Sequence, residues 1–253
     1  MAYPNYSYPP GLYARLVRDI VLLRPRDFHQ DATLCIDRLQ PPLHVSGHQN
    51  IPEQGRCVIT INHYHRPGFG AQWLALGVSA LVPVHVHWVM TGEFTDWRKK
   101  YLPSGPIGVM VSRILLKRIA DIYGFTTMPP MPPRPKDLQA RVASVQAVLE
   151  YVRSAKDVML GLAPEGYDPP NGILMRPAPG LGRFGLLLSK AGLTFLPAGA
   201  YEADGVFHLN FGEMYRLSVS NSLSVAEKDQ CAIEIMMKHV AHLLPVHLRG
   251  EFA

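Results

Sequence analysis

Short apolar runs that alternate with longer segments of helical periodicity constrain the fold of this chain most strongly. Residues 57–61, 84–90 and 158–162 are apolar at almost every position, as is typical of strands that are buried on both faces of a sheet. Segments between them place apolar residues three and four apart, the spacing of an amphipathic helix. We therefore predict an α/β fold, in which a single domain has a central, mostly buried sheet flanked by helices.

The remaining elements follow the same two patterns. We predict further strands at 43–45, 193–201 and 206–212, and helices at 69–80, 107–122, 138–152 and 181–191. Ser224 and Glu227 have the spacing of a capping box, which opens a last helix that Pro245 stops. The proline-rich segment 128–135 is predicted to be a stiff, extended connector rather than a ligand for a proline-binding domain.

A basic amphipathic helix is predicted near the N-terminus. Leu12, Leu16 and Ile20 lie four residues apart on one stripe, and arginines stand beside that stripe. Such a helix is typical of a segment that lies in a membrane interface, and equally of a helix that caps the core of its domain. The formal net charge of +5 favours anionic partners. We divide the chain into this helix with a linker, residues 1–42, and an α/β domain, residues 43–253.

The sequence favours neither a membrane-spanning helix nor a disulfide scaffold. Residues 71–90 carry no charged side chain, but they contain Pro83 and two histidines, so we predict a helix up to Ala80 and a strand from Val84. The three cysteines form no paired motif, which favours a reducing interior. The predicted location is cytoplasmic and peripheral, on the inner face of a membrane.

His63 and His65 follow the predicted strand at 57–61, in the sequence Asn-His-Tyr-His-Arg-Pro-Gly. A His-x-His pair at a strand end places both imidazoles on one face, where they can bind a metal ion. No acidic residue stands at ligand spacing beside the other histidines, so a metal-dependent hydrolase is the third of our alternatives. The Gly-x-Gly-x-x-Gly motif at 180–185 follows prolines rather than a strand, and we therefore reject a dinucleotide site there.

A second candidate site lies where residues 158–162 run into Ala163-Pro164-Glu165-Gly166. Proline and glycine fix a sharp turn, which presents Glu165 just beyond the strand. Arg176 stands in the loop that follows. The turn alone indicates little about function, because Pro-Glu-Gly turns are common.

Taken together, the two segments resemble the glycerolipid acyltransferase superfamily, which includes the lysophosphatidic acid acyltransferases. That family carries Asn-His-x-Ser-x-x-Asp after a strand, then Phe-Pro-Glu-Gly, then a strand that ends in Val-Pro-Val. Here "NHYHRPG", "APEG" and "FLPAGA" occur in the same order within residues 43–217. The resemblance implies transfer of a fatty acyl group from acyl-CoA or acyl carrier protein to a hydroxyl of a lysophospholipid or related glycerolipid. It implies a membrane surface as a further partner, with neither a cofactor nor nucleic acid.

The resemblance also implies roles for individual residues. His63 matches the catalytic histidine, a neutral imidazole that takes the proton of the acceptor hydroxyl as this attacks an acyl thioester. Arg176 lies where the family often has a basic residue, which is expected to pair with a phosphate. The substrate-binding residues that we expect around His63 are Asn62, His65, Arg66, Glu165, Gly166 and Arg176, with Asn62 also holding the strand end.

The chain departs from the family at the acid that partners the histidine. Gly68 stands where the family has its aspartate, and His65 stands at the serine position. Such an acid fixes the tautomer of the histidine and stabilises the imidazolium, and in a serine-protease triad its replacement lowers turnover roughly 10⁴-fold. We therefore expect one of two outcomes. Either His65, Glu93 or Asp96 folds back onto His63, or the protein is a catalytically impaired, lipid-binding member of the same fold.

Overall fold

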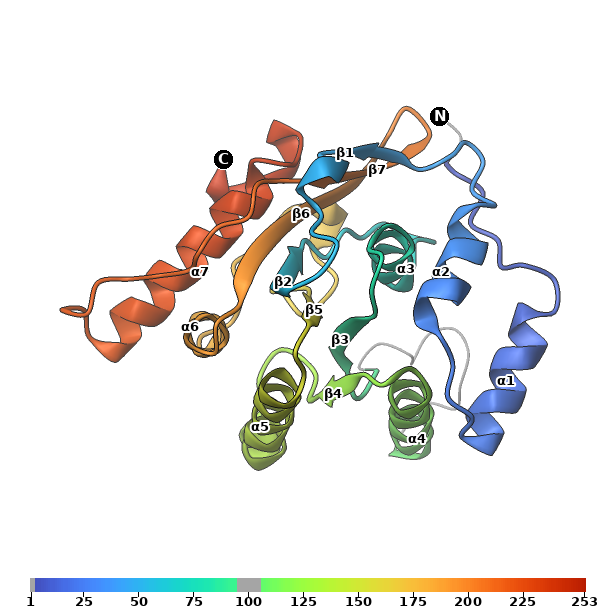
Figure 1. Ribbon diagram of the computed structural model, residues 1–253, viewed down its shortest axis with the longest axis horizontal. Helices are drawn as coiled ribbons and strands as arrows, with labels where there is room; N and C mark the ends of the chain where they lie inside the picture. The colour runs from blue at the N-terminus through green and yellow to red at the C-terminus, as the bar shows by residue number, and fades with distance from the viewer. Residues whose placement is uncertain (1–2, 95–105) are drawn as a thin grey trace.

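The computed structural model describes residues 3–94 and 106–253. Through the middle of this part of the chain runs a seven-stranded sheet in the order β1-β7-β6-β2-β5-β3-β4 (Figure 1). The strands are His44–Ser46 (β1), Arg56–Ile61 (β2), Val86–Thr91 (β3), Thr126–Met128 (β4), Val158–Leu162 (β5), Thr194–Ala203 (β6) and Val206–Phe211 (β7).

All neighbouring strands are parallel except β6 and β7, which form an antiparallel hairpin. The carboxyl ends of parallel strands lie at the same edge of a sheet, where open α/β sheets place their ligands. The segments that follow β2, β3, β4 and β5 therefore meet at one edge, and the end of β6 reaches it as well.

Helices cover both faces of the sheet (Figure 1). Helices α5, α6 and α7 lie along one face, α2, α3 and α4 lie on the other side, and α1 packs beside α4. The helices are Leu12–Leu22 (α1), Phe28–Ile36 (α2), Gln72–Leu81 (α3), Pro106–Tyr123 (α4), Leu138–Ser154 (α5), Leu181–Lys190 (α6) and Val225–Ala241 (α7).

The core lies on both faces of β2 and β5, which are apolar at nearly every position. Ile59 packs in the cluster that contains residues of α2 and α3, whereas its neighbour Val58 packs in the cluster that contains residues of α5 and α6. Successive side chains of a strand point to opposite faces, so a strand between two helical layers must be apolar throughout. The predicted α/β fold with a buried central sheet is confirmed.

Two elements escaped the sequence prediction. Helix α2 lies in the segment that we treated as a linker; Asp27 caps it by accepting a bond from the amide of Gln30 at 3.1 Å. Its residues Ala32 and Cys35 belong to the same core cluster as the sheet. Strand β4 occupies the first position of the proline-rich segment 128–135 and the two threonines before it. The boundary between residues 42 and 43 stays a prediction.

Helix α1 carries two apolar stripes, one packed against the domain and one exposed. Leu12 is buried, and Leu16 and Ile20 are partly buried, whereas Val17 and Val21 are 51% and 63% exposed. The predicted stripe thus packs against the domain, and a second apolar stripe faces outward. Within residues 3–94 and 106–253, no helix is both long enough and apolar enough to cross a bilayer.

The glycines at 180–185 open α6, but the N-terminus of this helix already has an acidic partner. The carboxylate of Asp229 on α7 accepts hydrogen bonds from the amides of Gly180 at 2.7 Å and Arg183 at 2.8 Å. Residues 173–178, which precede the motif, form an irregular loop. This arrangement agrees with the rejection of a dinucleotide site.

Candidate active site

The pairing of β2 with β5 brings His63 and Glu165 together. Thr60 pairs with Leu162 in the parallel register, so His63 and Glu165, each three residues further on, leave the sheet side by side. The main-chain N–H of His63 donates to Oε2 of Glu165 at 2.5 Å. Two segments that are 102 residues apart in the sequence therefore meet at the edge of the sheet where the strands end.

Glu165 is completely buried and acts as a clamp. Its second oxygen, Oε1, accepts a hydrogen bond from the amide of Met175 at 2.8 Å. Burial raises the pKa of Glu165 to about 7, although the two amide donors pull it downward. The carboxylate thus joins the segment after β2, the turn after β5 and the loop that contains Met175.

Asn62 extends the pairing of β2 with β6 beyond the last strand residue. Its side-chain amide donates to the carbonyl of Ala200 at 2.9 Å, and its carbonyl oxygen accepts from the amide of Ala200 at 2.7 Å. The side chain is buried and therefore imitates one more main-chain pair. This is the strand-end role that we expected of Asn62; a contact with substrate stays a prediction.

The imidazole of His63 faces a carboxylate. Its Nδ1 lies 3.0 Å from Oδ1 of Asp168, and the side chains are 17% and 52% exposed. The approach lacks the N–H alignment of a full hydrogen bond, and the buried Nδ1 has no other partner among the described residues. The close approach of the His63 side chain lowers the pKa of Asp168, and the charges of His63 and His65 lower it further.

His65 approaches the same carboxylate from the second side. Its Nδ1 lies 3.5 Å from Oδ2 of Asp168. The two histidines of the His-x-His motif thus share one acidic neighbour. Among residues 3–94 and 106–253, however, no three histidine, cysteine, aspartate or glutamate side chains are placed to hold a metal ion. The metal-hydrolase alternative therefore lacks a ligand set in this part of the chain.

The acid at His63 comes from a residue that sequence reasoning missed. Glu93, one of the expected partners, is buried in ion pairs with Arg113 at 2.6 Å and Arg134 at 2.9 Å. Hydrogen bonds from these two arginines, above all from Arg134, lower the pKa of Glu93 to about 2. Glu93 is thus paired elsewhere, and Asp96 lies outside the described residues. The sequence signal for Asp168 was its position three residues after Glu165, in the same loop.

The two expected basic contacts are already paired with acids. Arg66 donates to both carboxylate oxygens of Glu202, one at 2.8 Å, and its guanidinium lies 3.5 Å from the centre of the Tyr3 ring. Arg176 pairs with Glu234 at 3.0 Å and Glu251 at 2.9 Å. A phosphate at either arginine would have to compete with these carboxylates, and both contacts stay predictions.

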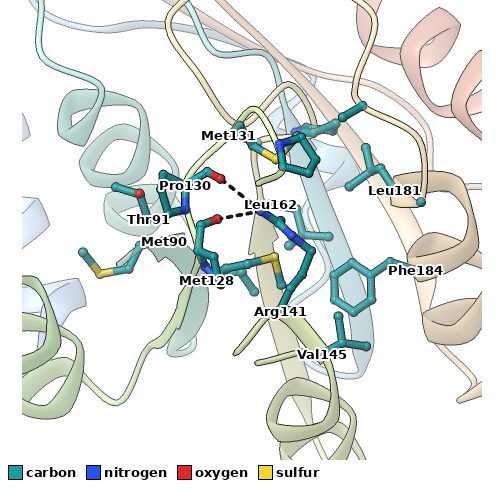
Figure 2. A pocket seen from close by; sticks show the side chains of 18 of the residues that line it. Met90, Thr91, Met128, Pro130, Met131, Arg141, Val145, Leu162, Leu181 and Phe184 are labelled. Atoms are coloured by element: carbon teal, nitrogen blue, oxygen red, sulfur yellow. Dashed lines mark hydrogen bonds between the residues drawn. The ribbon is translucent and has the colours of Figure 1, made fainter. Parts of the chain in front are cut away.

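An apolar pocket of about 180 Å³ lies behind the turn that carries Glu165. Pro164 and Gly166, the two neighbours of Glu165, line it. The guanidinium of Arg141 donates hydrogen bonds to the carbonyl oxygens of Pro129 and Pro130 at 3.1 and 3.0 Å. Figure 2 shows it beside Pro130. The other walls are largely apolar and include Met128, Met131, Val145, Leu162 and Phe184.

The strand order and the helical layers define an α/β fold with a histidine at the carboxyl edge of its sheet. The chain is similar to the crystal structure of the 1-acyl-sn-glycerophosphate (LPA) acyltransferase, PlsC, from Thermotoga maritima. The TM-score is 0.52, with 14% sequence identity, over 91% of this chain and 88% of that chain. No protein-family model and no curated protein matches the sequence. At this identity, the similarity shows a shared fold.

Proposed function

We propose that the protein is a glycerolipid acyltransferase. It moves a fatty acyl group from acyl-CoA or acyl carrier protein to a hydroxyl of a lysophospholipid or related lipid, without a cofactor. The observation that carries this proposal is the junction of His63 with Glu165. The two segments on which the family resemblance depends meet at one edge of the sheet, in a chain that shares its fold with an LPA acyltransferase.

His63 is the base of the proposed reaction. Nε2 accepts the proton of the acceptor hydroxyl while the hydroxyl oxygen attacks the thioester carbonyl carbon, so that a C–O bond forms. When the tetrahedral intermediate collapses, the C–S bond breaks and the proton passes from Nε2 to the leaving thiolate. The ring remains partly exposed, which leaves room for the acceptor to approach.

A panel of acceptors tests the proposal directly. The purified chain is incubated with radiolabelled acyl-CoA, or with acyl carrier protein carrying the same label, and with lysophospholipids that differ in headgroup. Labelled diacyl product with at least one acceptor is the expected result. Hydrolysis of the donor without any acylated acceptor would contradict the proposal.

The pocket beside the turn is the proposed site of the acyl chain. It is largely apolar, and it shares Pro164 and Gly166 with the turn that positions Glu165 against His63. A bound alkyl chain would bury the side chains of Met131, Val145 and Phe184.

Filling this pocket should shorten the acyl chains that the enzyme accepts. Val145→Phe adds volume at the wall, and we expect turnover of long acyl-CoAs to fall about 10-fold relative to short ones, as a few lost methylene contacts would cause. Val142→Phe is the matched control, because Val142 lies one turn earlier on α5 and is 45% exposed. If turnover depends on acyl-chain length in the same way for both variants, the acyl chain does not bind in this pocket.

The outward faces of α1 and α4 are the proposed contact with an anionic membrane. Helix α4 packs beside α1 and adds an exposed apolar stripe of its own, Ile107, Met110, Val111 and Ile114. Arg15 and Arg24 are exposed near the α1 stripe and supply the positive charge that favours anionic headgroups. This surface would keep the protein peripheral on the inner face of a membrane.

Charged residues on that stripe should release the protein from membranes. Sedimentation with vesicles that contain phosphatidylglycerol measures the bound fraction. Val17→Glu with Val21→Glu replaces two exposed apolar contacts by two negative charges, and we expect binding to fall at least about 10-fold. Val225→Glu with Val246→Glu is the control, since these valines are 64% and 69% exposed on another part of the molecule. Equal sedimentation of both double variants would refute the α1 surface.

A further inference from the structure

We propose that Asp168 is the positioning acid of His63 and that it replaces, from a different loop, the carboxylate that position 68 lacks. This inference rests on the proposed function, in which His63 is the base. The carboxylate would hold a proton on Nδ1 and stabilise the imidazolium that forms when Nε2 takes the proton of the acceptor hydroxyl.

The orientation of the ring carries the proposal. Nδ1 is the nitrogen that faces inward, and Oδ1 of Asp168 lies 3.0 Å from it. A neutral histidine carries a proton on one ring nitrogen only, and the group that faces this nitrogen selects the tautomer. A carboxylate at Nδ1 selects the tautomer with Nδ1–H, and this leaves the lone pair of Nε2 available as the base.

The backbone conformation at position 68 favours glycine, and no acidic side chain stands there. Gly68 adopts φ +86°, a left-handed conformation that disfavours side chains, in the loop that leads from His63 into α3. The segment after β2 thus turns toward α3 at this position. The acid that completes the site has to come from another loop at the same edge of the sheet.

The loop that carries Asp168 is built to hold it there. Glu165 closes the base of the loop through its bond to the amide of Met175. Pro169 and Pro170 follow Asp168 and fix their own φ angles, and Pro169 also restricts the backbone of Asp168 to extended conformations. At the far side, Gly172 packs so closely on Tyr64 that a Cβ atom would lie 3.0 Å from the ring.

The charged groups around the pair favour an ionised Asp168. His63 and His65 face its two oxygens at 3.0 and 3.5 Å, and both lower the pKa of its carboxyl group. Glu165 is the other acidic group in contact with His63, and it binds the main-chain amide instead of the ring. Asp168 is therefore the acid in direct contact with the imidazole among the described residues.

Asp168→Asn tests the proposal with two readouts. Asparagine keeps the shape of the side chain and removes its charge, so kcat should fall about 10²- to 10³-fold, no more than on loss of His63 itself, with little change in KM. Independently, the ring ¹⁵N chemical shifts of His63 report which nitrogen carries the proton; the Nδ1–H tautomer should predominate in the wild type and lose its predominance in Asp168→Asn, because the carboxylate that selects it is gone. Asp168→Glu should recover part of both effects. Asp157→Asn, at the opposite end of β5, is the control and should change neither.

The outcomes separate this inference from the proposed function. A fall in kcat with an unchanged His63 tautomer would mean that Asp168 only supports the loop, and the inference would be overturned. A changed tautomer with unchanged kcat would overturn it as well. If the tautomer changes but the wild type acylates no acceptor in the panel, the pairing of Asp168 with His63 stands and the acyltransferase proposal fails.

Discussion

Replacing His63 by alanine should lower kcat/KM for acyl transfer about 10³-fold, which corresponds to about 4 kcal/mol of transition-state stabilisation. The substitution removes the proposed base, whose role is to take the proton of the acceptor hydroxyl. It leaves the fold intact, because Glu165 is held by the main-chain N–H of residue 63 and not by the ring. Radiolabelled transfer and thermal unfolding, measured on the same preparation, separate the two effects.

The controls for this substitution follow from the same geometry. His247 is an exposed histidine near the C-terminus, and His247→Ala should keep both activity and stability. Binding of lysophospholipid to His63→Ala should stay within about 2-fold of the wild type, because the proposed role of the ring lies in the transition state. A variant that retains more than about a tenth of the transfer rate would exclude His63 as the essential base.

The sequence allowed most of the fold to be predicted because the strands are buried on both sides. Continuous apolar runs such as 158–162 have one plausible structure between helical segments, and β5 occupies exactly these residues. Strand β4 has three residues, two of them threonines, and is followed by prolines, so no apolar run marks it. Helix α2 was missed because only its packing against α3 shows that it belongs to the core.

The residues of the candidate site that belong to sequence motifs could be predicted, but the residue that another loop contributes could not. His63 and Glu165 could be named from their motifs, and the register Thr60 to Leu162 explains why they meet. Asp168 could not be named, because a carboxylate 105 residues after its partner has no fixed sequence spacing. Only the path of the loop after Gly166 brings it to Nδ1 of His63. A missing motif residue therefore says little about a site until the neighbouring loops are placed.

Glu165 should make the stability of the protein fall as the pH rises from about 4.5 to 7. Its ordinary pKa of 4.5 applies to the unfolded chain, whereas burial raises the pKa of the folded state to about 7. The folded protein therefore binds the proton more tightly, and the stability that this confers is complete below pH 4.5 and is lost as the pH rises through 7. The difference between the two pKa values corresponds to about 3 kcal/mol of stability.

Glu165→Gln removes this dependence, because an amide resembles the protonated acid in shape and does not ionise. Urea unfolding at pH 5 and pH 8 measures the free energies of both proteins. The stability of the wild type relative to Glu165→Gln should decrease by about 2.5 kcal/mol between these pH values, because a part of the effect is already lost at pH 5. Glu213→Gln, an exposed substitution beyond β7, should show no such trend. Parallel pH profiles for the wild type and Glu165→Gln would mean that the clamp between His63 and Met175 is ionised throughout this range.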